Sequence, residues 1–167
     1  MIEQVLTGAV AGGTCIVFAG LGEFVAERSG VINLGTEGSM LCGALTAYAV
    51  GIETGNPWIG VAAGMLAGLA LSAVFAAMVL LRKANQIAMG LVVSFLGIGI
   101  TALFGQDYVG KGVVPLETWD IPGLSKLPFF GPILFQHDPL TYLSFIAVPL
   151  ITWGLWRTRA GLILRSA

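Results

Sequence analysis

The polar stretch that decides the fold reads Glu27-Arg28-Ser29-Gly30-Val31-Ile32-Asn33-Leu34-Gly35-Thr36-Glu37-Gly38. Apolar runs lie on both sides of it, and its charges and glycines distinguish it from an ordinary lipid-facing helix. An ionisable side chain at membrane depth is costly, so it is by default a candidate functional residue. Irregular backbone at that depth is tolerated only where protein buries it or where it lines a water-filled cavity. We therefore expect the remaining apolar helices to pack around this segment.

The composition indicates a protein with several membrane spans. Of its 167 residues, 56% are hydrophobic and only 10% are charged, whereas soluble domains carry roughly 25% charged residues. The net charge of -1 argues against a nucleic-acid-binding protein, which needs a basic face. Cys15 and Cys42 lie far apart in apolar runs, so we interpret both as small buried hydrophobic residues.

Five apolar segments are long enough to cross a bilayer, which takes about 20 helical residues. We therefore predict an all-α, polytopic transmembrane bundle that forms a single domain over residues 1–167. The expected spans cover residues 4–26, 31–52, 57–81, 86–106 and 139–156. The second helix is expected to break near its start, because Gly30, Gly35 and Gly38 permit left-handed or interrupted backbone.

Helix starts and packing faces can also be predicted. Asn56-Pro57 and Asp138-Pro139 each place a capping side chain before a proline at the first helical position, and Pro149 is expected to kink the last span. Small residues recur every four positions on two spans, and small residues let helix backbones approach closely in lipid. We interpret these stripes as contacts within one bundle, with self-association as the alternative. They comprise Gly60, Gly64, Gly68, Ser72 and Ala76, and then Gly97, Thr101 and Gly105.

The basic residues predict the orientation, because Lys and Arg concentrate in cytoplasmic loops. One side of the alternating spans receives Arg28, Arg82, Lys83, Arg157, Arg159 and Arg165. Lys111 and Lys126 fall in the long 107–138 loop, which we therefore place outside. Prolines and aromatic residues in that loop suggest a position at the membrane interface. His137, beside a helix start, is interpreted as a solvated loop residue.

The polar segment holds the candidate functional residues. Asn33 and Glu37 are four apart and would share a face on a helix, as would Glu23 and Glu27. A helix that begins near Gly35 would also aim unsatisfied N–H groups into the bundle, where they could anchor a polar ligand. We take Asn33, Glu37 and Glu23 as candidates for a substrate path or gate.

A structural interpretation of the same residues stays open. Glu27 and Arg28 would then pair at the cytoplasmic interface, and Glu37 would be a hydrogen-bonded packing residue. Asn85 and Gln86 are read as a second cytoplasmic turn or cap. The sequence shows no metal-ligand cluster, no nucleophile–base motif and no Walker A pattern, so neither enzymatic chemistry nor nucleotide hydrolysis is expected of this chain.

The segment at residues 27–38 resembles the signature of permease subunits of bacterial ABC importers. Within them it is most similar to the nucleoside or simple-sugar branch, which is linked to basic membrane proteins and related to ribose and branched-chain amino acid permeases. Four further stretches fit in order: Ala84-Asn85-Gln86-Ile87, Ile121-Pro122-Gly123-Leu124-Ser125, Gly131-Pro132-Ile133-Leu134-Phe135 and Arg157-Thr158-Arg159-Ala160-Gly161-Leu162. Such permeases are roughly twice as long, so the chain looks like the N-terminal portion of one.

The resemblance implies a multi-pass subunit of the bacterial plasma (inner) membrane that imports its substrate by alternating access. Its expected partners are a second permease subunit, cytoplasmic ATPase subunits and an extracytoplasmic substrate-binding protein. ATP and Mg would bind to the ATPase, and no cofactor to this chain. Nucleosides are the expected substrate. The alternatives are a ribose-type simple sugar and a truncated membrane scaffold that transports nothing.

Overall fold

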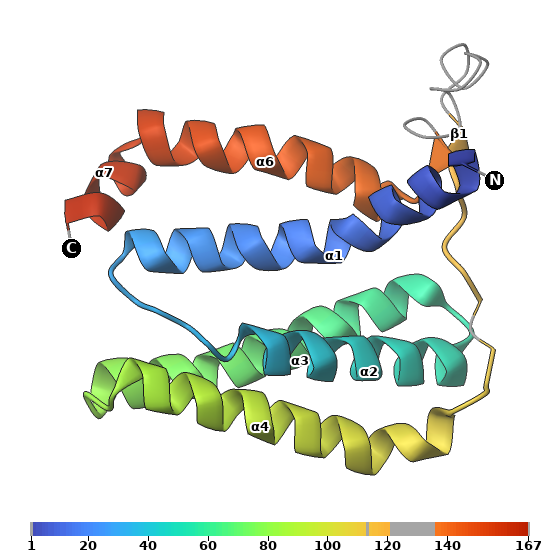
Figure 1. Ribbon diagram of the computed structural model, residues 1–167, viewed down its shortest axis with the longest axis horizontal. Helices are drawn as coiled ribbons and strands as arrows, with labels where there is room; N and C mark the ends of the chain where they lie inside the picture. Colours follow the sequence, from blue (N-terminus) through green and yellow to red (C-terminus); the bar gives the residue numbers. More distant parts are fainter. Residues whose placement is uncertain (1, 113, 121–135, 167) are drawn as a thin grey trace. The chain divides into compact units, whose positions relative to one another are not determined.

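The computed structural model describes residues 2–112, 114–120 and 136–166, and these residues are almost entirely helical (Figure 1), which confirms the predicted all-α class. The long helices are α1 (Ile2–Arg28), α2 (Thr36–Thr54), α3 (Pro57–Ala76), α4 (Gln86–Phe104) and α6 (Pro139–Arg157). The short elements are the π-helical turn η1 (Ala77–Leu81), the 3-10 turn η2 (Gly105–Tyr108), the strands β1 (Trp119–Asp120) and β2 (Gln136–His137), and α7 (Arg159–Ser166).

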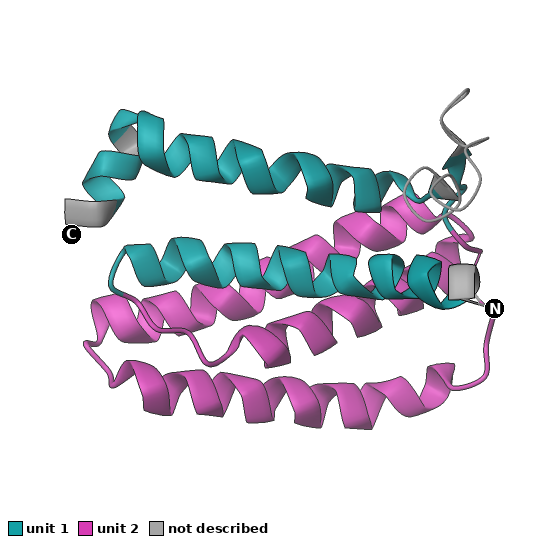
Figure 2. Ribbon diagram, turned by 45° about the horizontal axis from the view of Figure 1, so that its top comes forward, with its two compact units in different colours: residues 1–30, 116–167 teal, residues 31–115 magenta. Residues whose placement is uncertain are grey.

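The chain divides into two compact units (Figure 2). Unit 1 joins residues 1–30 to residues 116–167 and contains α1, α6 and α7. Unit 2 is the continuous segment 31–115 and contains α2, α3 and α4. The single permease domain predicted from the sequence stays a prediction, and each unit is described separately below.

Unit 2 is built around α2, which packs against both α3 and α4 (Figure 1). Its apolar core lies at the end near η1, where Phe75, Val79 and Val93 are buried together. The partly buried residues Val31, Leu71 and Met89 surround this cluster. Val31 belongs to the polar segment, so the segment is tied to the core of unit 2 from its first apolar residue.

Four helical stretches of the described chain are long and apolar enough to cross a membrane, whereas the sequence predicted five spans. They are Val5–Arg28, Pro57–Leu81, Gln86–Tyr108 and Pro139–Arg157. The difference is α2, which begins at Thr36 and not at residue 31. The apolar residues Val31, Ile32 and Leu34 therefore lie outside the helix, while α2 carries acidic residues near both ends. The break predicted near the start of the second helix corresponds to this late start at Thr36, and from there α2 is continuous to Thr54.

Two of the predicted caps are formed and one is not. The Asn56 side chain accepts a hydrogen bond from the Trp58 N–H at 3.0 Å. Asn85 accepts from Ile87 and Ala88 at 3.0 and 3.1 Å, so the cap expected there is confirmed. Asp138 occupies the cap position before Pro139, but its side chain makes no capping hydrogen bond. Helix α6 continues through Pro149, and its predicted kink stays a prediction.

In unit 1, α1 and α6 meet through buried polar side chains. The hydroxyls of Thr14 and Thr141 lie 3.3 Å apart, and Ser144 donates to the Thr141 carbonyl at 2.7 Å. Hydroxyl pairing of this kind is a common means of joining helices within membranes. The rest of α1 is largely exposed, and Cys15 with it, so the prediction that Cys15 is buried was wrong. Cys42 is buried as predicted.

His137 is buried, with 3% of its surface exposed, so its interpretation as a solvated loop residue was wrong. The reason is the antiparallel pairing of β2 with β1, in which His137 lies opposite Trp119. Tyr142 secures this turn, because its hydroxyl accepts from the His137 N–H and donates to the Trp119 carbonyl. The two family stretches within 121–135 lie outside the described residues.

Candidate functional site

The polar segment leaves α1 through a tight turn. The N–H groups of Ser29 and Gly30 donate to the carbonyls of Ala26 and Glu27, both at 3.0 Å. Gly30 then adopts a φ of 79°, in the left-handed region that glycine enters without steric cost. Glycine is therefore favoured at this backbone turn, which ends α1.

Residues 31–35 next run in irregular conformation along α4. The Ile32 N–H donates to the Gln86 side-chain oxygen at 2.9 Å. The Ser94 hydroxyl donates to the Leu34 carbonyl at 2.7 Å. Between them lies Gly90, where a β-carbon would be 2.8 Å from the Leu34 nitrogen. Backbone groups without a helical partner are thus satisfied by α4, which is the condition for irregular backbone inside a membrane.

The start of α2 is organised by the same segment. The Asn33 side chain accepts from the Gly35 N–H at 2.9 Å, and the Thr36 hydroxyl donates to the Asn33 carbonyl at 3.0 Å. Asn33 therefore lies outside the helix and stabilises the turn before it. The predicted helical face shared by Asn33 and Glu37 does not form, because the helix begins only at Thr36.

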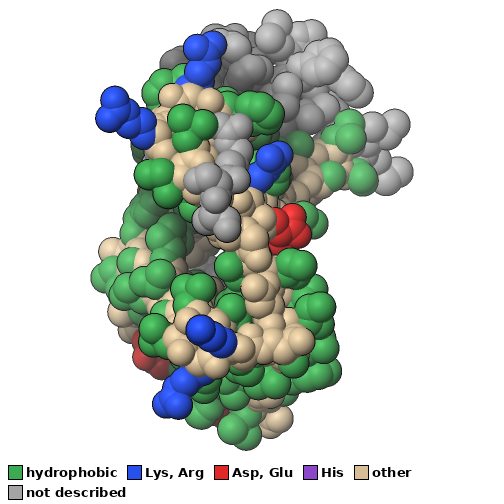
Figure 3. Space-filling model, turned by 90° about the vertical axis from the view of Figure 1, so that its left-hand side faces the viewer, with side chains coloured by type: hydrophobic (Ala, Val, Ile, Leu, Met, Phe, Trp, Pro, Cys, Tyr) green, Lys and Arg blue, Asp and Glu red, His purple; other side chains and the backbone are tan. Residues whose placement is uncertain are grey.

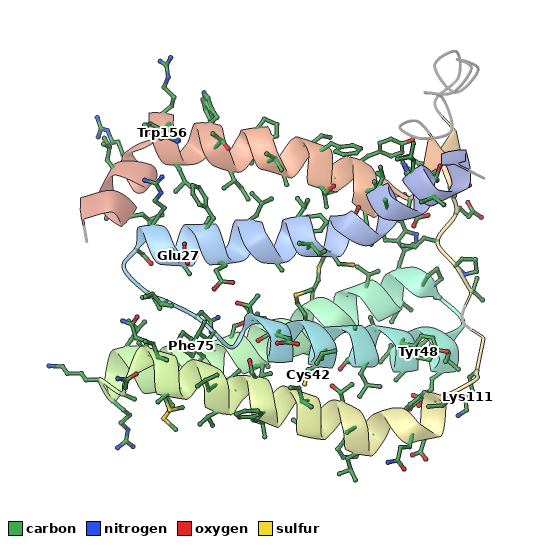
Figure 4. The ribbon with its side chains drawn as sticks, viewed as in Figure 1. Glu27, Cys42, Tyr48, Phe75, Lys111 and Trp156 are labelled. Carbon is green, nitrogen blue, oxygen red and sulfur yellow. The ribbon has the colours of Figure 1, made fainter. Side chains whose placement is uncertain are left out.

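Just after its start, α2 packs closely against α4 at a glycine. A β-carbon at Gly38 would lie 2.6 Å from the Val93 carbonyl oxygen and 2.7 Å from the Ser94 α-carbon. Real β-carbons do not approach other atoms so closely, so only glycine fits here. One turn further on, the Cys42 thiol lies 3.7 Å from the Gly97 carbonyl oxygen, a weak hydrogen bond. Figure 4 labels Cys42 on α2.

The other face of α2 packs on the stripe of α3. A β-carbon at Gly60 would be 2.5 Å from the Ala47 carbonyl oxygen, and one at Gly64 would be 2.7 Å from the Gly43 carbonyl oxygen. At Gly68 the nearest atom is the Ser39 carbonyl oxygen at 3.7 Å, an ordinary contact. Part of the predicted stripe is thus a close backbone contact within unit 2.

The carboxylates of the segment are not used in this packing. Glu37 is exposed in the first turn of α2, Glu27 is exposed, and Glu23 is half-buried on α1. Among the described residues Glu27 and Arg28 form no ion pair. The Arg28 guanidinium instead lies over the rings of Phe24 and Trp156, at 5.0 and 6.0 Å from their centroids. The predicted role of Glu37 as a hydrogen-bonded packing residue does not match its exposed position.

The candidate site thus consists of two parts. Residues 31–35 are hydrogen-bonded to α4, and the start of α2 that follows them carries the exposed carboxylate of Glu37. Sequence reasoning identified Gln86 but missed Ser94 and Gly90, whose contacts hold the segment. A signal was available, since both lie on one face of the fourth span at four-residue spacing. In the described part of the chain, no group of three or more His, Cys, Asp or Glu residues is placed to hold a metal ion.

Residues 5–167 match the family described as "Branched-chain amino acid transport system / permease component", so the chain belongs to that family. It is a multi-pass membrane protein of the ABC permease type. Membership of this family confirms the prediction that the chain is part of a transporter subunit.

Three curated relatives are similar over most of the chain. The ABC transporter permease protein TsgC13 of Haloferax volcanii, whose name gives glucose as a provisional substrate, is 40% identical over 161 residues, or 94% of this chain and 49% of the relative. The guanosine ABC transporter permease protein NupQ of Bacillus subtilis is 32% identical, over 90% of this chain and 51% of the relative. The nucleoside ABC transporter permease protein NupC of Lactococcus lactis subsp. cremoris is 29% identical, over 92% and 52%.

The chain therefore spans about half the length of the curated relatives it matches. No solved structure is similar to it at a significant level.

Proposed function

We propose that this chain is the membrane-spanning part of a permease subunit of an ATP-driven importer whose substrate is a nucleoside. The family match over residues 5–167 is the observation that carries this proposal. Two of the three relatives named above have guanosine or nucleoside in their names. Substrate would cross the membrane by alternating access between helices.

Within this function the polar segment has two parts with different roles. The irregular stretch 31–35 positions the start of α2, because its hydrogen bonds to Gln86 and Ser94 and the Asn33 turn fix where the helix begins. Glu37 lies one residue beyond that start and is exposed. Its carboxylate is therefore available to a polar substrate or to a gating partner, with the half-buried Glu23 of α1 as a second candidate.

The energy for transport would come from other chains. The proposed partners are a second permease subunit, cytoplasmic ATPase subunits that bind ATP and Mg, and an extracytoplasmic substrate-binding protein. These assignments follow from the family type. The proposed location is a bacterial plasma membrane, with 82–83 and 157–165 on the cytoplasmic side.

A simple sugar is the second candidate substrate. The observation in its favour is the 40% identity to the Haloferax volcanii protein with glucose in its name. A nucleoside also contains a sugar ring with several hydroxyl groups, so the two candidates share the chemistry that polar groups near Glu37 would recognise. The base of a nucleoside is what would distinguish them.

Uptake assays would separate these functions. The full-length permease would be expressed with candidate ATPase and binding-protein chains from the same organism, in a host without its own nucleoside and glucose transporters. We expect ATP-dependent uptake of labelled guanosine, competed by other nucleosides and unaffected by glucose. Uptake of glucose alone would select the second candidate. Uptake of neither substrate, with the complex assembled in the membrane, would favour the scaffold alternative.

A further inference from the structure

One end of unit 1 carries three exposed arginines beside two tryptophans. Arg28 ends α1, Arg157 ends α6 and Arg159 begins α7. Figure 4 labels Glu27 and Trp156 at the adjoining ends of these two long helices. Figure 3 views that end and shows basic side chains projecting from it. The exposed carboxylate of Glu27 is the acidic group next to Arg28, so positive charge predominates there.

Two aromatic rings fix the position of the Arg28 charge. Its guanidinium lies 5.0 Å from the centroid of Phe24, on its own helix, and 6.0 Å from that of Trp156 on α6. Both distances fall within the range of a cation–π interaction. Because Trp156 directly precedes Arg157, this contact places the Arg28 charge at the end of α6 that carries Arg157.

The turn between α6 and α7 keeps Arg159 close to Arg157 at the end of α6. The Thr158 hydroxyl accepts from the Gly161 N–H at 3.2 Å, which caps α7. Gly161 is buried against the end of α6, where an added β-carbon would be 2.6 Å from the Leu155 α-carbon. The helix α7 is therefore seated closely on α6, and its first residue cannot move far from Arg157.

Beside these charges, α6 presents exposed apolar side chains. Leu150, Trp153 and Trp156 are 62%, 64% and 59% exposed. In a multi-pass membrane protein such a surface faces lipid, and exposed tryptophans lie at the level of the headgroups. Arg157 and Arg159 follow Trp156 along the chain, and the Arg28 guanidinium lies over the Trp156 ring, which places all three charges at the headgroup level as well.

We propose that this end of unit 1, formed by Arg28, Trp156, Arg157 and Arg159, binds the headgroups of anionic phospholipids. Charge complementarity is the reason, because three exposed positive charges meet the negative surface of a leaflet beside a lipid-facing helix. Arginine binds phosphate well, since its planar guanidinium donates two parallel hydrogen bonds. The proposal does not depend on the transported substrate.

The test measures lipid binding by the full-length permease. Native mass spectrometry would compare retained lipid after reconstitution in phosphatidylcholine alone or with phosphatidylglycerol added. We expect selective retention of phosphatidylglycerol. Arg157→Gln or Arg159→Gln should each weaken it about fivefold, because a basic residue near an anionic surface contributes about 1 kcal/mol. Lys111→Gln is the control: it removes an exposed charge from the loop after α4 and should leave retention unchanged.

A second pair of variants tests the geometry at constant charge. Trp156→Ala removes the ring beside Arg28 and should weaken retention about two- to fivefold, by loss of the cation–π interaction. Trp153→Ala removes a similarly exposed tryptophan that lies under no cation of the described residues, and it should have a smaller effect. Equal effects of Lys111→Gln and Arg157→Gln, or no preference for phosphatidylglycerol, would overturn the proposal. The proposal would also be overturned if Arg157→Gln and Arg159→Gln retained the lipid but no longer purified together with the ATPase chain.

Discussion

Gly38 of α2 and Gly97 of α4 are in direct backbone contact. A β-carbon added to Gly97 would lie 2.5 Å from the Gly38 α-carbon and 2.6 Å from its carbonyl carbon. This contact lies one turn beyond the irregular segment that Gln86 and Ser94 hold on α4. The start of α2 is thus fixed from two sides, by hydrogen bonds before it and by glycine packing after it.

Gly97→Ala should therefore destabilise the protein, because the added methyl group meets backbone that cannot rotate away. We expect a loss of about 1–3 kcal/mol, the usual cost of overpacking, seen as a lower midpoint of thermal unfolding in detergent. Gly99→Ala is the control, since a β-carbon there has nothing within 4 Å. An equal midpoint for the two variants would mean that α2 and α4 are not in close contact.

The stripe of α3 gives a graded prediction. Gly64→Leu should separate α3 from α2 and lower the thermal midpoint strongly, because even a β-carbon there would be 2.7 Å from the Gly43 carbonyl oxygen. Gly68→Leu should be milder and Gly68→Ala neutral or stabilising, since the nearest atom is 3.7 Å away and alanine favours a helix over glycine by about 1 kcal/mol. The reverse order would show that the stripe faces lipid.

Ser94→Ala tests the hydrogen bond that holds the irregular segment. It leaves the Leu34 carbonyl without its donor at 2.7 Å, and the net loss of such a partly buried hydrogen bond costs about 0.5–1.5 kcal/mol. Thr152→Ala is a suitable control, because among the described residues that exposed hydroxyl bonds only to the Val148 carbonyl of its own helix. Hydrogen exchange at residues 31–38 should rise in the first variant and not in the second.

Local signals in the sequence predicted some of these features and not others. The starts at Asn56 and Asn85 were predictable, because a cap depends on residues two or three positions away. A start of α2 near Gly35 was also expected from its glycines, but the contacts that fix it were not, because Gln86 and Ser94 lie 54 and 60 residues from their partners. The burial of His137 likewise depends on a pairing with Trp119 across a long loop. Long-range contacts thus overrode the helical pattern of Asn33 and Glu37.

The orientation predicted from the basic residues can be tested with single cysteines. Lys83→Cys and Lys111→Cys, in a background without Cys15 and Cys42, should react with an impermeant thiol reagent from opposite faces of the membrane. Both positions are exposed, so access is not limited by packing. Labelling of Lys83→Cys from outside would reverse the proposed topology. The background needs its own stability control, because Cys42 is buried against α4.

Glu37 is the residue whose charge we expect to matter for transport. It is exposed in the first turn of α2, so Glu37→Gln removes a charge without breaking a contact among the described residues. The stability lost through the helix dipole is at most about 1 kcal/mol. In the full-length protein assembled with its partners, we therefore expect reduced uptake with normal membrane abundance and normal complex assembly.

Glu53→Gln is the matched control for this substitution. Glu53 is an exposed carboxylate near the other end of the same helix, and glutamine can still accept the hydrogen bond that Tyr108 donates at 2.6 Å. Uptake by this variant should match that of the parent. If Glu37 has a structural role instead, Glu37→Gln should keep normal uptake and Glu37→Leu should reduce the abundance of the protein in the membrane. Normal uptake and abundance in both would remove Glu37 from the candidate site, and the exposed carboxylate would then be a solvated end of α2.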